Sequence, residues 1–260
     1  MSTCGHRALG ALTLGLGLAV FTSSGATACP ACPGSFDEML QETELVFRGT
    51  VTDITYTMSE AGGPDNASIP YTFVTYEVSE LYFGNLEGDN NSVTLRFTGG
   101  WDHTSQLFMQ TSATPLFDKG DHDILFVAGN NQRLSPIAGG FNGRLRIIDG
   151  QVYEETGREM LMHGDRTFRF GNRYFSPDVF TTTVGDGIMT LTMDTDENDL
   201  HFGRSNAISE HQAIRIVRGL TAELPAADSV FVNANPELRI PAPDMTPVAL
   251  AADGDAAVDP

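Results

Sequence analysis

Cysteine and lysine are scarce in this chain. Three of its 260 residues are cysteines. Lysine occurs once, at Lys119, so 14 of the 15 basic residues are arginines. Cys4 lies in the apolar N-terminal region, which leaves Cys29 and Cys32 for the rest of the chain. This number of cysteines excludes a disulfide-rich scaffold, so an apolar core must hold the fold together.

Positive charge is also in short supply. The chain has 34 acidic and 15 basic residues, and its formal net charge is −19 at pH 7. Nucleic acids and anionic lipids bind proteins through Lys and Arg, so we expect no nucleic-acid partner. After the N-terminal region, no stretch is long and apolar enough to predict a transmembrane helix.

The N-terminal region has the pattern of a secretory signal. An apolar run over Ala8–Phe21 is followed by small residues that end in Ala26-Thr27-Ala28. The run is too short for a settled bilayer span, and Ala26 and Ala28 form the Ala-x-Ala pattern that precedes signal cleavage. The sequence therefore predicts a signal peptide over 1–28 and an exported protein, in the periplasm, at the cell surface or outside the cell.

Cleavage after Ala28 makes Cys29 the first residue of the mature chain. A lipoprotein signal also requires a cysteine there, although the usual Leu three residues earlier is Ala26. A lipidated Cys29 would hold the protein at a membrane and would be unable to form a disulfide. Without the lipid, Cys29 and Cys32 have the spacing of a local disulfide or of a redox dithiol.

Two helices are predicted from capping patterns. Ser35 and Glu38 form a capping box before a short amphipathic helix over 36–43. A second helix is predicted over 210–218, where Ser209 and Gln212 have the same spacing.

Between these helices, strand patterns dominate. Alternating or continuously apolar residues predict strands over 45–56, 71–83, 92–98, 123–128, 145–148, 151–153 and 187–194. Asp149-Gly150 between two of them predicts a two-residue hairpin turn.

The N-terminal half resembles the netrin-like module, whose members include the tissue inhibitors of metalloproteinases. The resemblance lies in Cys29-Pro30 and Cys32-Pro33 before a short helix, in the strand pattern of 44–51, in the long strand that ends at Leu81-Tyr82-Phe83-Gly84, and in 119–128. It implies an OB-like five-stranded barrel with a flanking helix. In the inhibitors the N-terminal cysteine binds the protease zinc, and only Cys29 matches that position.

The expected fold is therefore mainly β. Residues 29–138 form the OB-like, netrin-like barrel, and 139–222 form a β-hairpin-rich extension with one helix. From 223 to 260 the chain is rich in Pro, Ala and Asp, and this composition predicts a disordered tail, in which 229–232 could add one strand.

No recognisable catalytic constellation is present. The chain has no Gly-x-Ser-x-Gly, His-Glu-x-x-His or phosphate-loop pattern, so we expect no catalytic residues, metal or cofactor. Asp121-His122-Asp123 is interpreted as a polar loop or strand edge.

Together these patterns predict an exported, non-enzymatic binding module with an unknown protein or small-molecule partner, which binds through the loops 62–69 and 99–115. Membrane attachment would require a lipid on Cys29. Two alternatives stay open: a thiol-disulfide protein that uses Cys29 and Cys32, and a metalloenzyme inhibitor that acts through Cys29.

The first prediction concerns processing. Intact-mass analysis of the protein from its native host should give a chain that begins at Cys29, because Ala26-Thr27-Ala28 supplies the cleavage pattern. The same spectrum distinguishes a loss of two hydrogens, for a Cys29–Cys32 disulfide, from the added mass of a lipid. A chain that retains residues 1–28 would contradict the prediction.

Overall fold

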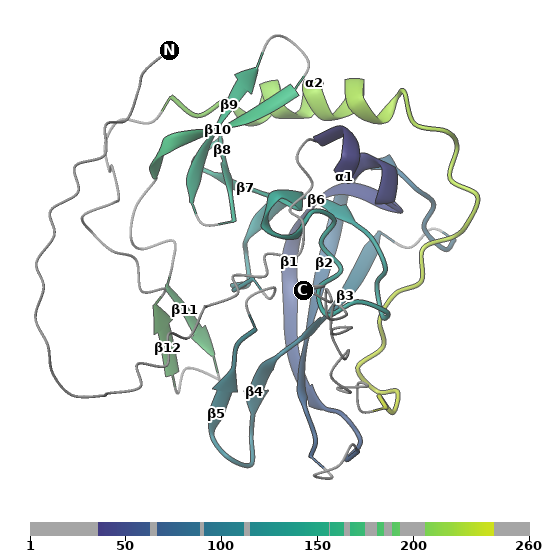
Figure 1. Cartoon of the computed structure of the whole chain (residues 1–260), viewed down its shortest axis with the longest axis vertical. Helices are drawn as coiled ribbons and strands as arrows, with labels where there is room; N and C mark the ends of the chain where they lie inside the picture. The colour runs from purple at the N-terminus through teal and green to yellow at the C-terminus, as the bar shows by residue number, and fades with distance from the viewer. Residues whose placement is uncertain are drawn as a thin grey trace, which may run out of the picture. The chain divides into compact units, whose positions relative to one another are not determined.

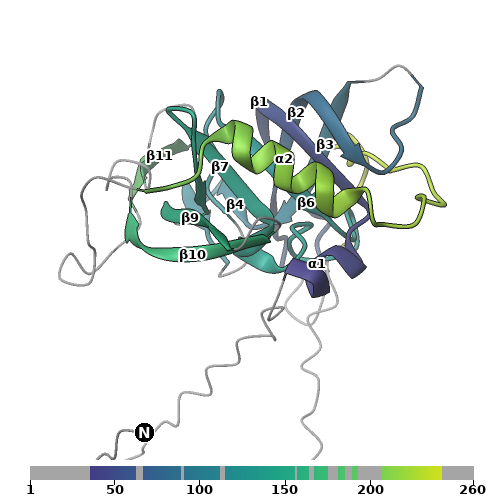
Figure 2. The ribbon, with the colours of Figure 1, turned by 90° about the horizontal axis from the view of Figure 1, so that it is seen from above.

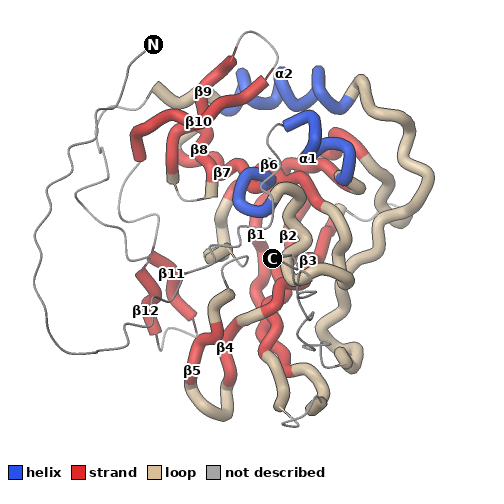
Figure 3. Tube along the Cα trace, in the orientation of Figure 1, coloured by secondary structure: helices blue, strands red, loops and turns tan. Residues whose placement is uncertain are grey.

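Antiparallel strands make up most of the described chain, which we examined in a computed structural model (Figures 1 and 3). The structure describes residues 36–62, 67–88, 91–111, 115–155, 157–163, 167–174, 181–184, 189–192 and 206–241. The strands are β1 Leu45–Met58, β2 Pro70–Phe83, β3 Ser92–Thr98, β4 Gly100–Asp102, β5 Leu107–Met109, β6 His122–Val127, β7 Arg144–Ile148, β8 Gln151–Glu154, β9 Arg158–His163, β10 Thr167–Tyr174, β11 Thr181–Val184 and β12 Met189–Thr192. The helices are α1 Phe36–Glu42, α2 Glu210–Thr221 and the 3-10 turn η1 Gly140–Gly143.

Eight strands form one antiparallel sheet in the order β10-β9-β8-β7-β6-β1-β2-β3. At its centre β1 pairs with β2 on one side and with β6 on the other. The hairpin β4–β5 and the pair β11–β12 form separate two-stranded sheets. The predicted Asp149-Gly150 turn joins β7 to β8, with φ of 52° at Asp149 and 73° at Gly150.

Both faces of the central sheet are buried. On β6, Ile124 and Phe126 face a core that includes residues of α1 and α2, whereas Leu125 and Val127 face a second core on the opposite side. This explains the continuous apolar run of β6, because successive side chains of a strand point to opposite faces.

Helix α2 covers one face of the sheet (Figure 2). Its predicted capping box is present: Ser209 Oγ accepts from the Gln212 backbone N–H at 3.3 Å, and the Ser209 N–H donates to Gln212 Oε1 at 3.0 Å. The side chain of Arg48 on β1 pairs with Glu210 at 2.7 Å and fixes the start of the helix to the sheet. Within the described residues, no helix has the length and apolar character needed to cross a membrane.

The chain after α2 packs against the other face. Residues 224–241, which the composition assigned to a disordered tail, include Phe231 with 7% of its surface exposed. The Phe231 N–H donates to the Asn85 carbonyl at 2.8 Å, and the Ala234 N–H donates to the Thr94 carbonyl at 2.9 Å. Buried apolar side chains and hydrogen bonds thus order this Pro-rich segment, while 242–260 lie outside the described residues.

Side-chain amides occupy the outer edge of β3. Asn233 Oδ1 accepts from the Thr94 N–H at 2.8 Å, and Asn130 Oδ1 accepts from the Arg96 N–H at 3.1 Å. Asn130 Nδ2 also donates to the Thr94 carbonyl at 3.0 Å. These amides supply the bonds that a neighbouring strand would otherwise make.

The mainly β class, the flanking helix and the C-terminal helix are confirmed, but the described strands close no five-stranded barrel. Closure fails because β6 pairs with β7, so the sheet continues through β8, β9 and β10. Of the strands expected in a separate extension, those over 145–148 and 151–153 therefore belong to the same sheet as β1 and β2, whereas the strand over 187–194 contributes β12 to the separate pair β11–β12.

The packing of the C-terminal segment gives a stability prediction. Phe231→Ala should lower the free energy of unfolding by about 3 kcal/mol, because it removes a buried aromatic ring from the core. Val232→Ala is the matched control: Val232 is 71% exposed, and such a surface change should cost less than about 0.5 kcal/mol. Urea unfolding of both variants tests this, and equal midpoints would show that the segment does not stabilise the fold.

Candidate functional site

The residues that the sequence singled out for chemistry lie outside the described part of the chain. Ala26 and Ala28 at the predicted cleavage site and the pair Cys29 and Cys32 all precede Phe36, where the description begins. Cleavage, lipidation and disulfide formation therefore stay predictions. Of the two loop regions expected to bind a partner, 99–115 contributes to a pocket in the described structure.

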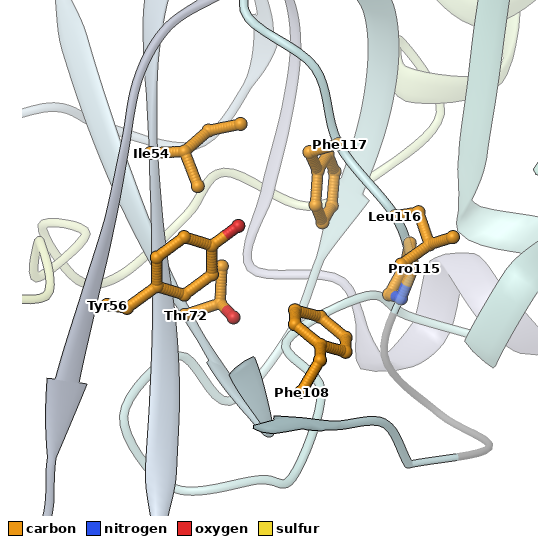
Figure 4. Close-up of a pocket in the computed structure, with 7 residues that line it drawn as sticks. All are labelled: Ile54, Tyr56, Thr72, Phe108, Pro115, Leu116 and Phe117. Carbon is orange, nitrogen blue, oxygen red and sulfur yellow. The ribbon is translucent and has the colours of Figure 1, made fainter. Parts of the chain in front are cut away.

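This pocket is a shallow hollow between the sheet and the β4–β5 hairpin (Figure 4). Its volume of about 230 Å³ includes space open to solvent, and the enclosed part is about 10 Å³. Its seven lining residues come from β1, β2, β5 and the segment 115–117: Ile54, Tyr56, Thr72, Phe108, Pro115, Leu116 and Phe117.

The lining divides into a buried floor and a half-buried rim. Thr72, Pro115 and Phe117 are buried, whereas the side chains from β1 and β5 keep partial contact with solvent. Tyr56 and Phe108 form an edge-to-face pair across the rim, with ring centroids 6.3 Å apart and planes at 86°. Such aromatic pairs are favourable in this geometry, so they hold the two walls at a fixed separation.

Glycine allows the hairpin to approach the sheet this closely. Gly100 has a φ of 145°, and a Cβ at this position would lie 2.6 Å from Thr72 Oγ1 and 2.9 Å from Tyr56 Cδ1. The hairpin turn is fixed by Asp102, whose Oδ1 accepts from the Thr104 N–H at 2.8 Å. These features place Phe108 over the pocket.

A buried ionic cluster adjoins the pocket at Phe117. The guanidinium carbon of Arg144, a fully buried side chain, lies 4.1 Å from the centroid of the Phe117 ring. Its Nε donates to Asp123 Oδ2 at 3.0 Å and its Nη2 to Asp121 Oδ2 at 2.7 Å. Its Nη1 donates to the Glu155 carboxylate at 3.0 and 3.2 Å. We call Arg144, Asp121, Asp123 and Glu155 the Arg144 cluster.

Two further side chains complete the surroundings of the cluster. Tyr76 on β2 donates its hydroxyl to Asp123 Oδ2 at 2.8 Å, and Arg146 Nη2 lies 3.3 Å from Asp121 Oδ1. Asp123 Oδ1 has no hydrogen-bond partner among the described residues. With three carboxyl groups and two guanidinium groups, the fully ionised set carries one excess negative charge.

Burial and charge move the carboxyl pKa values apart. Burial raises the pKa of Glu155 to about 7, although Arg144 opposes the rise. Burial also raises the pKa of Asp123. At Asp121, the attraction of Arg144 and Arg146 outweighs the effect of burial and lowers the pKa. Protons therefore bind this cluster first at Glu155 and Asp123, because their charged forms are the less well compensated.

The described residues contain no group of three or more His, Cys, Asp and Glu side chains arranged to hold a metal ion. The carboxylates of the cluster face guanidinium groups. The pocket itself offers apolar surface and the Thr72 hydroxyl, which donates to the Gly99 carbonyl at 2.8 Å. This arrangement suits the binding of an apolar group.

Comparison of the chain with protein-family models, with curated proteins and with solved structures finds no significant match. The resemblance to netrin-like modules therefore stays a prediction.

Sequence patterns did not identify the Arg144 cluster. Asp121-His122-Asp123 was interpreted as a polar loop or strand edge, yet Asp123 is completely buried. The one available signal was the position of charged residues beside apolar strands: Asp123 opens the apolar run of β6, and Arg144 opens that of β7.

The raised pKa of Glu155 predicts a pH-dependent stability. Between its usual value of 4.5 and the folded value of about 7, the folded state binds the Glu155 proton more strongly than the unfolded state. The free energy of unfolding should therefore fall as pH rises through this window, by about 3 kcal/mol at most.

Urea unfolding from pH 5 to pH 8 measures this effect. Glu155→Gln removes the titrating group, so its stability should decline less over this range than that of the unmodified protein. Glu154→Gln is the matched control, because Glu154 is also buried but is paired with Arg158 at 3.7 Å. If the curves of the unmodified protein and Glu155→Gln run parallel, Glu155 is not the group responsible.

Proposed function

We propose that this protein is an exported, non-enzymatic binding module that holds a protein partner through one apolar side chain seated at the open mouth of the hollow beside β4–β5. The observation that carries the proposal is the pocket's construction. A half-buried rim of Ile54, Tyr56, Phe108 and Leu116 surrounds a buried floor. Export rests on the signal pattern in residues 1–28.

The size of the pocket favours a side chain over a larger ligand. Small-molecule sites usually enclose about 300–1,000 Å³, whereas the enclosed part of this hollow is about 10 Å³. Protein interfaces commonly depend on a few apolar or aromatic anchors that enter such recesses and exclude water. The partner therefore presents a Phe, Tyr, Leu or similar side chain.

Charge and aromatic content narrow the partner further. The net charge of −19 disfavours nucleic acid. The rings of Tyr56, Phe108 and Phe117 favour an aromatic anchor, because edge-to-face contacts add to the gain from apolar burial. The thiol-disulfide and inhibitor alternatives rest on Cys29 and Cys32, and no described residue favours either of them.

The pocket can be tested with toluene, the analogue of a phenylalanine side chain. Titration followed by backbone amide NMR should shift the signals of Tyr56, Thr72 and Phe108. Ile54→Phe should abolish these shifts, because the larger side chain fills the hollow from its rim. Ile54→Val is the matched control and should leave toluene affinity within about fourfold, since it removes a single methylene group.

Two outcomes would contradict the proposed function. One is the absence of toluene-induced shifts at these residues in the unmodified protein. The other is equal toluene binding by Ile54→Phe and Ile54→Val, which would place the toluene elsewhere.

A further inference from the structure

One wall of the pocket is attached to the Arg144 cluster at three consecutive residues. The Leu116 carbonyl accepts from Arg144 Nη1 at 2.8 Å. The Phe117 ring lies against the Arg144 guanidinium. The Asp118 N–H donates to Asp121 Oδ2 at 3.0 Å. We call residues 116–118 the wall segment.

The wall segment faces the pocket through the same residues that contact the cluster. Leu116 and Phe117 both line the hollow (Figure 4). Their backbone and ring positions depend on where the Arg144 guanidinium lies. A change in the orientation of Arg144 therefore changes the shape of the pocket.

Glu155 and the wall segment share one nitrogen of Arg144. Nη1 donates to the Leu116 carbonyl at 2.8 Å and to both Glu155 carboxylate oxygens, at 3.0 and 3.2 Å. An ionised carboxylate that accepts from a guanidinium forms a hydrogen bond that is stronger, by roughly a factor of two, than the bond of a neutral carboxyl group. The charge on Glu155 thus determines how firmly Nη1 is held beside Leu116.

We propose that Glu155 is a proton-dependent support of the pocket: its ionised carboxylate holds Arg144 and the wall segment in the binding geometry, and its protonation releases them. The inference concerns the regulation of the proposed binding pocket, so its ligand-dependent part rests on the proposed function. Glu155 is 4% exposed and accepts hydrogen bonds from Arg144. Burial and the repulsion of Asp123 raise its pKa more than the attraction of Arg144 and Arg146 lowers it, so its ionisation changes near neutral pH.

The other charged groups of the cluster respond differently. Asp121 stays ionised because Arg144 and Arg146 lower its pKa. Asp123 accepts from Arg144 Nε and from the Tyr76 hydroxyl, whereas Glu155 accepts from Arg144 Nη1. Titration of Asp123 therefore acts at Nε of the guanidinium, whereas titration of Glu155 acts at Nη1. Replacing Glu155 removes its own titration and leaves that of Asp123, so the two contributions can be distinguished.

The first test needs no ligand. Amide NMR of the full chain from pH 5.5 to pH 8.5 should show Leu116 and Phe117 signals that titrate with a midpoint near pH 7. Glu155→Gln, which mimics the protonated acid, should abolish this titration, whereas Glu154→Gln should retain it. A titration that persists in Glu155→Gln, or is absent from the unmodified protein, overturns the proposal.

The second test measures toluene affinity over the same pH range. The unmodified protein should bind toluene roughly threefold more weakly at pH 5.5 than at pH 8.5. Glu155→Gln should bind equally at both values, with the weaker affinity. If the unmodified protein binds toluene with the same affinity at both pH values, the proposal that Glu155 regulates binding is contradicted.

The two tests distinguish failure of the inference from failure of the proposed function. If toluene does not bind at any pH while Leu116 and Phe117 still titrate through Glu155, the binding function is contradicted and the proton-dependent wall stands. If toluene binds but the wall signals do not titrate, the pocket stands and the inference fails.

Discussion

The fold depends on a charge that is fully removed from water. Arg144 brings β7 together with β6, the end of β8 and the wall segment, and each of these supplies an oxygen to its guanidinium. Burying an ion is costly unless it is paired and hydrogen-bonded. Three carboxyl groups and a carbonyl meet that requirement here.

This arrangement joins two environments that usually lie apart in proteins. Phe117 contacts a guanidinium and lines an apolar hollow, so one ring separates a group of ions from a surface suited to hydrocarbon. The apolar side favours binding without geometric specificity, whereas the ionic side fixes positions through directed bonds. The apolar lining residues thus give the pocket its chemical character, and the Arg144 cluster behind Phe117 fixes its shape.

Local patterns predicted the elements whose causes are local. The α2 capping box, the Asp149-Gly150 turn and the buried strand β6 each arise from neighbouring residues, and all three are confirmed. The Arg144 cluster was missed because its partners are 11 to 28 residues away in sequence and because charged residues are usually exposed. Phe231 was missed for a related reason: one aromatic residue in a Pro-rich segment gives no periodic signal.

The amides of Asn130 and Asn233 at the edge of β3 have a consequence for association. An uncovered edge strand offers backbone groups that pair readily with another chain, in strand exchange or in fibrils. Here the groups of Thr94 and Arg96 already have partners that cannot extend a ladder. The backbone groups of Thr94 and Arg96 on this edge are therefore not free to pair with a strand of another chain.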